Sequence, residues 1–369
     1  MMMRRKRKMM MSRVAIPALL LIGCQGEREQ SSVHWSTKSG SVLGKDLQNS
    51  RLSVVEFDLN NASYAKIRDV AIELLLEAVD ADDPLLRANS IEALHAVPKY
   101  LAPAVQRGLV DKNHGVRYVA AMTVGQLQMR NISHLLEPLL DDKSLSVRGA
   151  AIYGLKRCDR VVDLSPLGAM ILSEYAEVRA NTAYILGELG NPTAIPLLRM
   201  AVKSNLSQGE PARKKIVNLQ ITEALVKLGA VDELEVIRAS LFTPSDQGEI
   251  IALACQICGR LGDMRVVPNL LDLALREGRF QQSAEVRMAA AMAVAQIAPE
   301  KAPQQVPHAY LKSPYPGLRA QAVLTLGIGG DMTNLGDLSM MLSDDNPVVQ
   351  VAAAGAILRI SGEIYGIHK

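Results

Sequence analysis

The chain has 369 residues, of which 49% are hydrophobic and only 4% aromatic, so its apolar content is mostly Ala, Leu, Val, Ile and Met. That composition favours thin helical layers over a large β-sheet core. The formal charge is +3, but six basic and no acidic residues precede Cys24, which leaves 35 basic against 38 acidic residues beyond it. A weakly acidic chain has no overall electrostatic attraction to nucleic acid, so we expect no nucleic-acid partner.

The first 23 residues read as an export signal. A basic run, RRKRK at 4–8, precedes a short apolar stretch from Val14 to Ile22. Such a stretch is too short to span a bilayer, which needs about 20 apolar residues. It ends in Leu-Ile-Gly-Cys24, which resembles the bacterial lipobox. The resemblance implies cleavage before Cys24 and lipidation of its sulfur and new amino group. The alternatives are an ordinary secretory signal with a chance cysteine and a basic segment that is not exported.

The segment from residue 24 to 61 reads as a polar tether. It is rich in Ser, Gln and Asn, has no helical period, and is expected to be flexible. Two or three acyl chains anchor a protein firmly, whereas one does not. We therefore expect a lipid-anchored protein of the cell envelope that faces the periplasm or the exterior. Gln25, where an Asp would favour the inner membrane, slightly favours the outer one.

From about residue 64 the chain repeats itself. The clearest copy is EVRANTAYILGELGNPTAIPLL at 177–198. It resembles the short HEAT-like repeat of phycobilisome lyases. With Arg179 as the reference, equivalent positions recur at intervals of 30, 31, 31, 39, 33, 36, 32 and 31 residues. These positions are Arg87, Arg117, Arg148, Arg179, Asn218, Ile251, Arg287, Arg319 and Gln350. Stacked repeats of this kind bury a continuous core. We therefore predict an all-α fold over residues 62–369, an α-α superhelix in the form of a right-handed solenoid of about nine HEAT-like helical hairpins.

Within each copy, the residues three, four, seven and ten places after the reference lie on one face of a helix. They are small at the first of these offsets, with Ile221 as the one exception, and mostly Leu, Val or Ile at offsets seven and ten. Four copies carry a glycine at offset eight, which suits close helix packing: Gly125, Gly187, Gly259 and Gly327. The recurring arginines are expected to contact neighbouring carboxylates or carbonyls.

Helix starts are indicated at Asp83-Pro84, Ser313-Pro314 and Asn346-Pro347, where a capping side chain precedes proline. The other helix of each hairpin is expected in the intervening runs, such as 132–140, 194–202 and 267–275. Extra residues near 203–215, 243–249 and 277–285 are expected in loops on one edge, which is often the functional edge.

The Cys255-x-x-Cys258 pair admits a redox or metal-binding interpretation. The repeat register argues against it. Cys255, Cys258 and Cys158 all occupy offsets where other copies carry core residues. We therefore expect buried structural cysteines, whereas a redox dithiol would favour an exposed helix amino end.

No catalytic, cofactor-binding or metal-binding residues are expected. Some HEAT-like proteins are enzymes, and deoxyhypusine hydroxylase holds two irons with repeated His-Glu pairs. None of the six histidines here is followed by Glu, and they lie in different repeats without ligand spacing. Bilin lyases share the repeat type, but a shared repeat transfers architecture rather than chemistry.

The expected function is that of a non-enzymatic scaffold that binds a protein or peptide on its concave face. In the family, the second helices line that face. Arg and Tyr are frequent interface anchors. The candidate surface comprises Gln126, Tyr153, Arg157, Tyr184, Glu188, Lys227 and Arg260. Two alternatives stay open: an enzyme or enzyme subunit related to bilin-lyase-type HEAT proteins, and a purely structural envelope protein.

Overall fold

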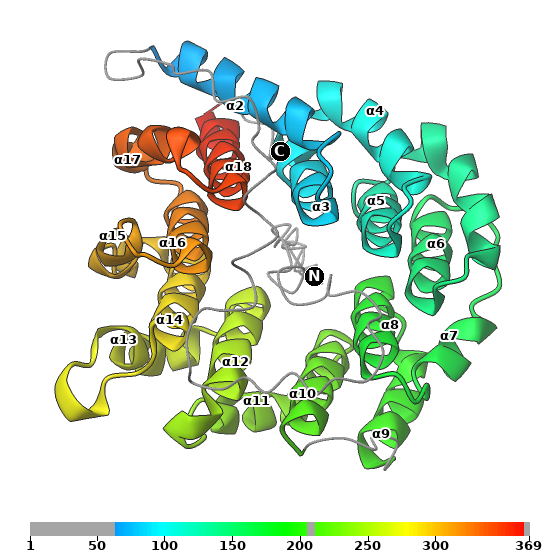
Figure 1. The fold of residues 1–369 in the computed structure, drawn as a ribbon. Coiled ribbons are helices and arrows are strands. Elements are labelled where there is room, and N and C mark those ends of the chain that lie inside the picture. Colours follow the sequence, from blue (N-terminus) through cyan, green and yellow to red (C-terminus); the bar gives the residue numbers. More distant parts are fainter. Residues whose placement is uncertain (1–62, 205–210, 365–369) are drawn as a thin grey trace, which may run out of the picture.

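A computed structural model describes residues 63–204 and 211–364, and these residues form nine helical hairpins without a strand. The first helix of each hairpin lies in an outer layer and the second in an inner layer (Figure 1). The outer helices are α2 (Tyr64–Ala78), α4 (Pro98–Leu109), η3 (Arg130–Asp141), α7 (Ser165–Met170), α9 (Ile195–Lys203), α11 (Leu234–Ser240), α13 (Val267–Leu275), α15 (Gln305–Tyr310) and α17 (Leu335–Met340).

The inner helices all begin on the same edge of the structure, because each hairpin repeats the direction of the last. They are α3 (Pro84–Ala93), α5 (His114–Gln126), α6 (Leu145–Arg157), α8 (Ala176–Leu189), α10 (Pro211–Lys227), α12 (Gly248–Leu261), α14 (Ala284–Ile297), α16 (Pro316–Ile328) and α18 (Pro347–Ile364). Short 3-10 turns join several elements: η2 (Leu94–Ala96), η4 (Pro192–Ala194), η5 (Val231–Glu233), η6 (Ser245–Gln247), η7 (Met264–Val266), η8 (Gly278–Phe280), η9 (Pro299–Lys301), η10 (Met332–Asn334) and η11 (Met341–Ser343).

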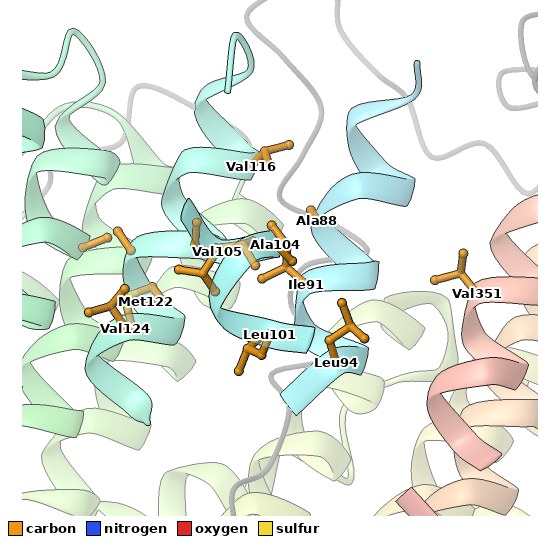
Figure 2. Close-up of a cluster of buried hydrophobic side chains, with 14 of the residues drawn as sticks. Ala88, Ile91, Leu94, Leu101, Ala104, Val105, Val116, Met122, Val124 and Val351 are labelled. Carbon is orange, nitrogen blue, oxygen red and sulfur yellow. The ribbon is translucent and has the colours of Figure 1, made fainter. Parts of the chain in front are cut away.

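The solenoid closes into a ring. The last helix, α18, packs against α2 and α3 of the first hairpin, and the inner helices surround a common centre (Figure 1). At this seam a Cβ built on Gly355 would lie 3.0 Å from Cβ of Ala93, so the two helices nearly touch. Val351 of α18 belongs to the same buried cluster as Ala88 and Ile91 of α3 (Figure 2). The hydrophobic core therefore continues across the seam.

The glycines at offset eight lie where inner helices meet in pairs. A Cβ on Gly187 would lie 3.1 Å from Cα of Ala224, and one on Gly327 would lie 2.8 Å from Cα of Ala356. Gly125 and Gly259 make the equivalent approaches to the next inner helix. The predicted role of these glycines in close packing is confirmed. They occur in alternate copies, so α5 pairs with α6, α8 with α10, α12 with α14, and α16 with α18.

Several reference arginines connect successive hairpins. Arg87 contacts both carboxylate oxygens of Asp111 at 2.7 Å, and its guanidinium also donates to two carbonyls of its own preceding loop. Arg117 repeats the arrangement with Asp142, and Arg319 pairs with Asp344. Burial alone would raise the pKa of Asp111, but the hydrogen bonds and charge of Arg87 and the N–H of Asn113 lower it below its usual range. The expected contacts of these arginines with carboxylates and carbonyls are confirmed.

The aspartate partner is missing where a serine replaces it. Ser173 stands at the position equivalent to Asp142, and Arg148 is left with a buried Nε that has no hydrogen-bond partner. Ser313 replaces the aspartate that Arg287 would meet, and Arg287 instead donates to the carbonyl of Ala274 and to the hydroxyl of Tyr310. The ion pairs therefore link some neighbouring hairpins and not others.

Most predicted helix boundaries are confirmed, with two differences. Asp83 caps α3 and Asn346 caps α18, each followed by a first-turn proline. Ser313 instead caps the turn before α16, which begins at Pro316. The predicted helix at 132–140 is a 3-10 helix that contains Pro138.

None of the helices within 63–204 and 211–364 is long and apolar enough to cross a membrane. The predicted signal at 1–23, the lipidation site Cys24 and the tether at 24–61 lie outside the described residues.

Candidate functional site

The inner wall of the ring brings most of the candidate residues together. Gln126 ends α5, Glu188 lies in the last turn of α8, Lys227 ends α10, and Arg260 lies in the last turn of α12. Their shared offset places them at the same end of these four inner helices. With Tyr184 and Glu223 they form a connected set, here called the inner-wall network: Gln126, Tyr184, Glu188, Glu223, Lys227 and Arg260.

A buried ion pair lies at the centre of the network. Arg260 Nε donates to Glu223 Oε1 at 2.8 Å and its Nη2 donates to Oε2 at 2.6 Å, with both side chains only 5% exposed. Burial would raise the pKa of Glu223, but the Arg260 charge and hydrogen bonds, together with Lys227, lower it to about 2. Glu223 is therefore ionised throughout the physiological range and joins α10 to α12.

Lys227 extends the network to α8 and α5. Its Nζ lies 3.0 Å from Glu223 Oε1 and 2.8 Å from Glu188 Oε1. It also lies 5.1 Å from the ring centroid of Tyr184, whose hydroxyl accepts a hydrogen bond of 3.2 Å from Gln126 Nε2. Burial would lower the pKa of Lys227, but the two carboxylates raise it above its usual range. The ammonium ion is thus held among two carboxylates and an aromatic face.

Tyr153 is a correction to the predicted surface. Its side chain is 1% exposed, because the absence of a side chain at Gly125 of the preceding inner helix leaves room for its ring. Burial, followed by the charge of Glu188, raises the pKa of Tyr153 to about 12. The neighbouring Arg157 is half-buried and hydrogen-bonds Tyr153. A partner can therefore contact Tyr153 only if the packing of α5 and α6 changes.

The sequence predicts only part of the inner-wall network, because the candidate surface does not include Glu223. It lies at offset five of its copy, four residues before Lys227, on the same helical face. An acidic residue in a row that is otherwise mostly apolar or aromatic was the available signal.

The network leaves little empty space. The hollow lined by Ala180, Tyr184, Gln220, Glu223, Ala224 and Lys227 has a volume of about 10 Å³. That is about the room of one water molecule. The charged and polar groups of these side chains pair with one another, and they do not enclose a pocket for a small organic molecule.

A second charged group lies at the ring seam. Glu92 of α3 and His95 of η2 both interact electrostatically with Arg359 of α18. Burial raises the pKa of Glu92 to about 8, although the positive charge of Arg359 opposes the shift. Burial also lowers the pKa of His95 to about 4. The contact that closes the ring therefore includes ionisable groups.

The internal cysteines are buried, as predicted from the repeat register. Cys158, Cys255 and Cys258 carry free thiols. Burial raises the pKa of the Cys258 thiol to about 12 and that of Cys255 further. In 63–204 and 211–364, no group of three or more His, Cys, Asp or Glu side chains is placed to hold a metal ion.

A protein-family model identifies the repeat type in two regions of the chain. The family of HEAT repeats matches residues 72–156 and 237–327. Human deoxyhypusine hydroxylase is a similar solved structure, with 17% identity, a TM-score of 0.34, and coverage of 72% of this chain and 96% of that one. The Escherichia coli protein YibA is another, with 17% identity, a TM-score of 0.29, and coverage of 80% and 97%. A search of the curated proteins found no match. The chain is an all-α solenoid that contains HEAT repeats.

Proposed function

We propose that the protein is a lipid-anchored scaffold of the bacterial cell envelope, whose ring binds a protein or peptide on its inner wall. The observation that carries this proposal is the closed ring with charged and aromatic side chains ordered along its inner helices. Repeat proteins commonly use such extended inner surfaces for binding.

The inner-wall network supports binding by preorganisation. Its members hold one another in place through hydrogen bonds and ion pairs across four inner helices. Rigid partner-facing groups lose less entropy when they bind. Glu188 and Lys227 keep part of their side chains exposed, at 31% and 21%, so they can exchange a mutual contact for one with a partner.

The membrane half of the proposal rests on the sequence around Cys24. A basic segment, a short apolar stretch and a lipobox-like end precede the cysteine in the order of a lipoprotein signal. The chain then enters the ring at α2, after 38 residues numbered 25–62.

The test is cross-linking in intact cells, followed by affinity capture and mass spectrometry of the wild type and of Cys24→Ala. We expect a stoichiometric protein partner with the wild type and its loss with Cys24→Ala. Recovery of the ring alone from both would contradict the scaffold and favour an enzymatic or purely structural role.

The binding surface is tested with the double variant Arg157→Gln, Glu188→Gln. It should weaken capture, whereas Val236→Ser on the exposed face of outer helix α11 should leave capture unchanged. Equal capture by both variants would place the partner elsewhere on the molecule.

A further inference from the structure

One edge of the ring divides into two arcs of different chemistry. In 63–204 and 211–364, the loops that lead from outer to inner helices lie on this edge. Those before α3, α5, α6 and α18 are rich in aspartate, namely Asp80, Asp82, Asp83, Asp111, Asp141, Asp142, Asp344 and Asp345. Those before α8, α12, α14 and α16 each carry one exposed aromatic ring, and these four residues form the aromatic arc: Tyr175, Phe242, Phe280 and Tyr315.

The rings of the aromatic arc are too exposed for packing to explain them. Tyr175, Phe242, Phe280 and Tyr315 are 61%, 70%, 59% and 49% exposed. The chain has only three phenylalanines, and the two in the described residues both lie here. Two of the loops, 243–249 and 277–285, are among the insertions that interrupt the repeat spacing. Phe280 lies within the second of these insertions, and Phe242 directly precedes the first.

We propose that the aromatic arc inserts into the lipid headgroup region of the membrane that carries the anchor. This inference rests on the proposed lipid anchor at Cys24. Each ring stands alone on its own loop, and neighbouring repeats are spaced by about 8–10 Å, the usual distance between packed helices. Separate aromatic rings at headgroup level are a usual feature of lipid interfaces, where one end of the ring is apolar and the other meets water.

The loop tip at Phe280 combines an apolar ring with a positive charge, which suits the boundary between lipid headgroups and acyl chains. Arg279 lies over the Phe280 ring, with its guanidinium carbon 4.6 Å from the ring centroid. Residues 275–281 are all exposed, so the ring can enter the acyl boundary while the guanidinium meets a phosphate. Acidic Glu277 and Asp246 also lie on the arc, so ring insertion rather than net charge must supply the attraction.

Because the lipid anchor keeps the ring near the membrane, even weak insertion of the aromatic arc is enough to hold it there. The 38 residues numbered 25–62 can span at most about 130 Å even when fully extended, so the ring stays close to the bilayer. Once the protein is anchored, contact of the aromatic arc with the lipid is an intramolecular event. The fraction of molecules with the arc inserted therefore rises without any new contact. The aspartate-rich arc lies on the same edge but on the other side of the ring, so a tilted ring that inserts the aromatic arc keeps the aspartates clear of the lipid.

The test uses the lipidated full-length protein in vesicles of phosphatidylethanolamine and phosphatidylglycerol, with brominated acyl chains as the fluorescence quencher. Trp35 is the chain's one tryptophan and is first replaced in Trp35→Phe. One reporter is Phe280→Trp in that background. The matched control is Val231→Trp, whose position is 65% exposed on the opposite edge, after inner helix α10.

We expect a blue shift and quenching for the Phe280→Trp reporter and neither for Val231→Trp. Equal behaviour of the two reporters would overturn the inference. A photo-cross-linking residue at position 280 in living cells should give a lipid adduct, and a protein adduct would overturn it in favour of a protein partner. Lipidation itself is read separately, from the mass of the peptide that begins at Cys24, so failure of the anchor and failure of the arc give different results.

Discussion

Gly327→Ala tests the close contact between α16 and the closing helix α18. The added methyl carbon would lie 2.6 Å from Cβ and 2.8 Å from Cα of Ala356. Carbon atoms normally approach to about 3.5–4.0 Å. One of the two atoms belongs to the backbone, so the clash can be relieved only if α18 moves away from α16.

The expected effect is the difference between two terms. Overpacking of a dense core costs about 1–3 kcal/mol, and replacing glycine inside a helix with alanine returns up to about 1 kcal/mol. Because the backbone of α18 must move, we expect Gly327→Ala to lower the free energy of unfolding by about 1–2 kcal/mol. In a unit of 150–250 residues each kcal/mol lowers the melting temperature by about 2–4 °C.

Urea and thermal unfolding followed by circular dichroism measure this loss. The matched control is Gly336→Ala in α17, where nothing lies within 4 Å of the added carbon. It should be neutral or more stable than the wild type by up to about 1 kcal/mol. If Gly327→Ala is as stable as Gly336→Ala, the reasoning on close packing is refuted.

Three further predictions concern titratable groups. Glu223 has a folded-state pKa of about 2, below its unfolded value, so its stabilising effect is present above pH about 4.5 and is lost as the pH falls toward 2. Glu223→Gln should remove that slope in urea unfolding and cost about 3–5 kcal/mol at neutral pH, because Arg260 stays buried without its partner; an unchanged slope would contradict the pairing. Glu92 has a folded-state pKa of about 8, above its unfolded value, so stability should fall as the pH rises from about 4.5 to 8. Glu92→Gln should flatten that dependence in thermal unfolding, and a wild-type profile in the variant would exclude Glu92 as its source. Cys255 and Cys258 should react with a thiol reagent only after unfolding, and rapid labelling of the native protein would restore the redox interpretation.

The repeat architecture could be predicted from the sequence because each hairpin obeys a local rule. The 3.6-residue period set the buried face of every inner helix, and the register placed Cys258 in the core. The recurring arginines also lay in a local pattern, since Arg117 meets an aspartate 25 residues further along the chain. Such rules depend on one hairpin and its neighbour.

Closure of the ring could not be predicted in the same way. Curvature is the sum of small rotations between hairpins, and no single residue encodes it. Gly355 contacts Ala93 across the whole length of the solenoid, at a distance of 262 residues along the chain. The burial of Tyr153 escaped prediction for a related reason, because it depends on Gly125 in another copy.

The closed ring is the frame on which the proposed scaffold depends, and one cross-link tests it most directly. In Ala93→Cys, Gly355→Cys the two Cβ atoms start 3.0 Å apart, and a separation of about half an ångström to one ångström brings them into the range of about 3.5–4.5 Å that disulfides need. The thiols of Cys158, Cys255 and Cys258 are buried and should not compete. A closed ring predicts rapid disulfide formation within one chain under mild oxidation and a changed mobility on a non-reducing gel. If the pair stays reduced in the folded protein, the solenoid is open.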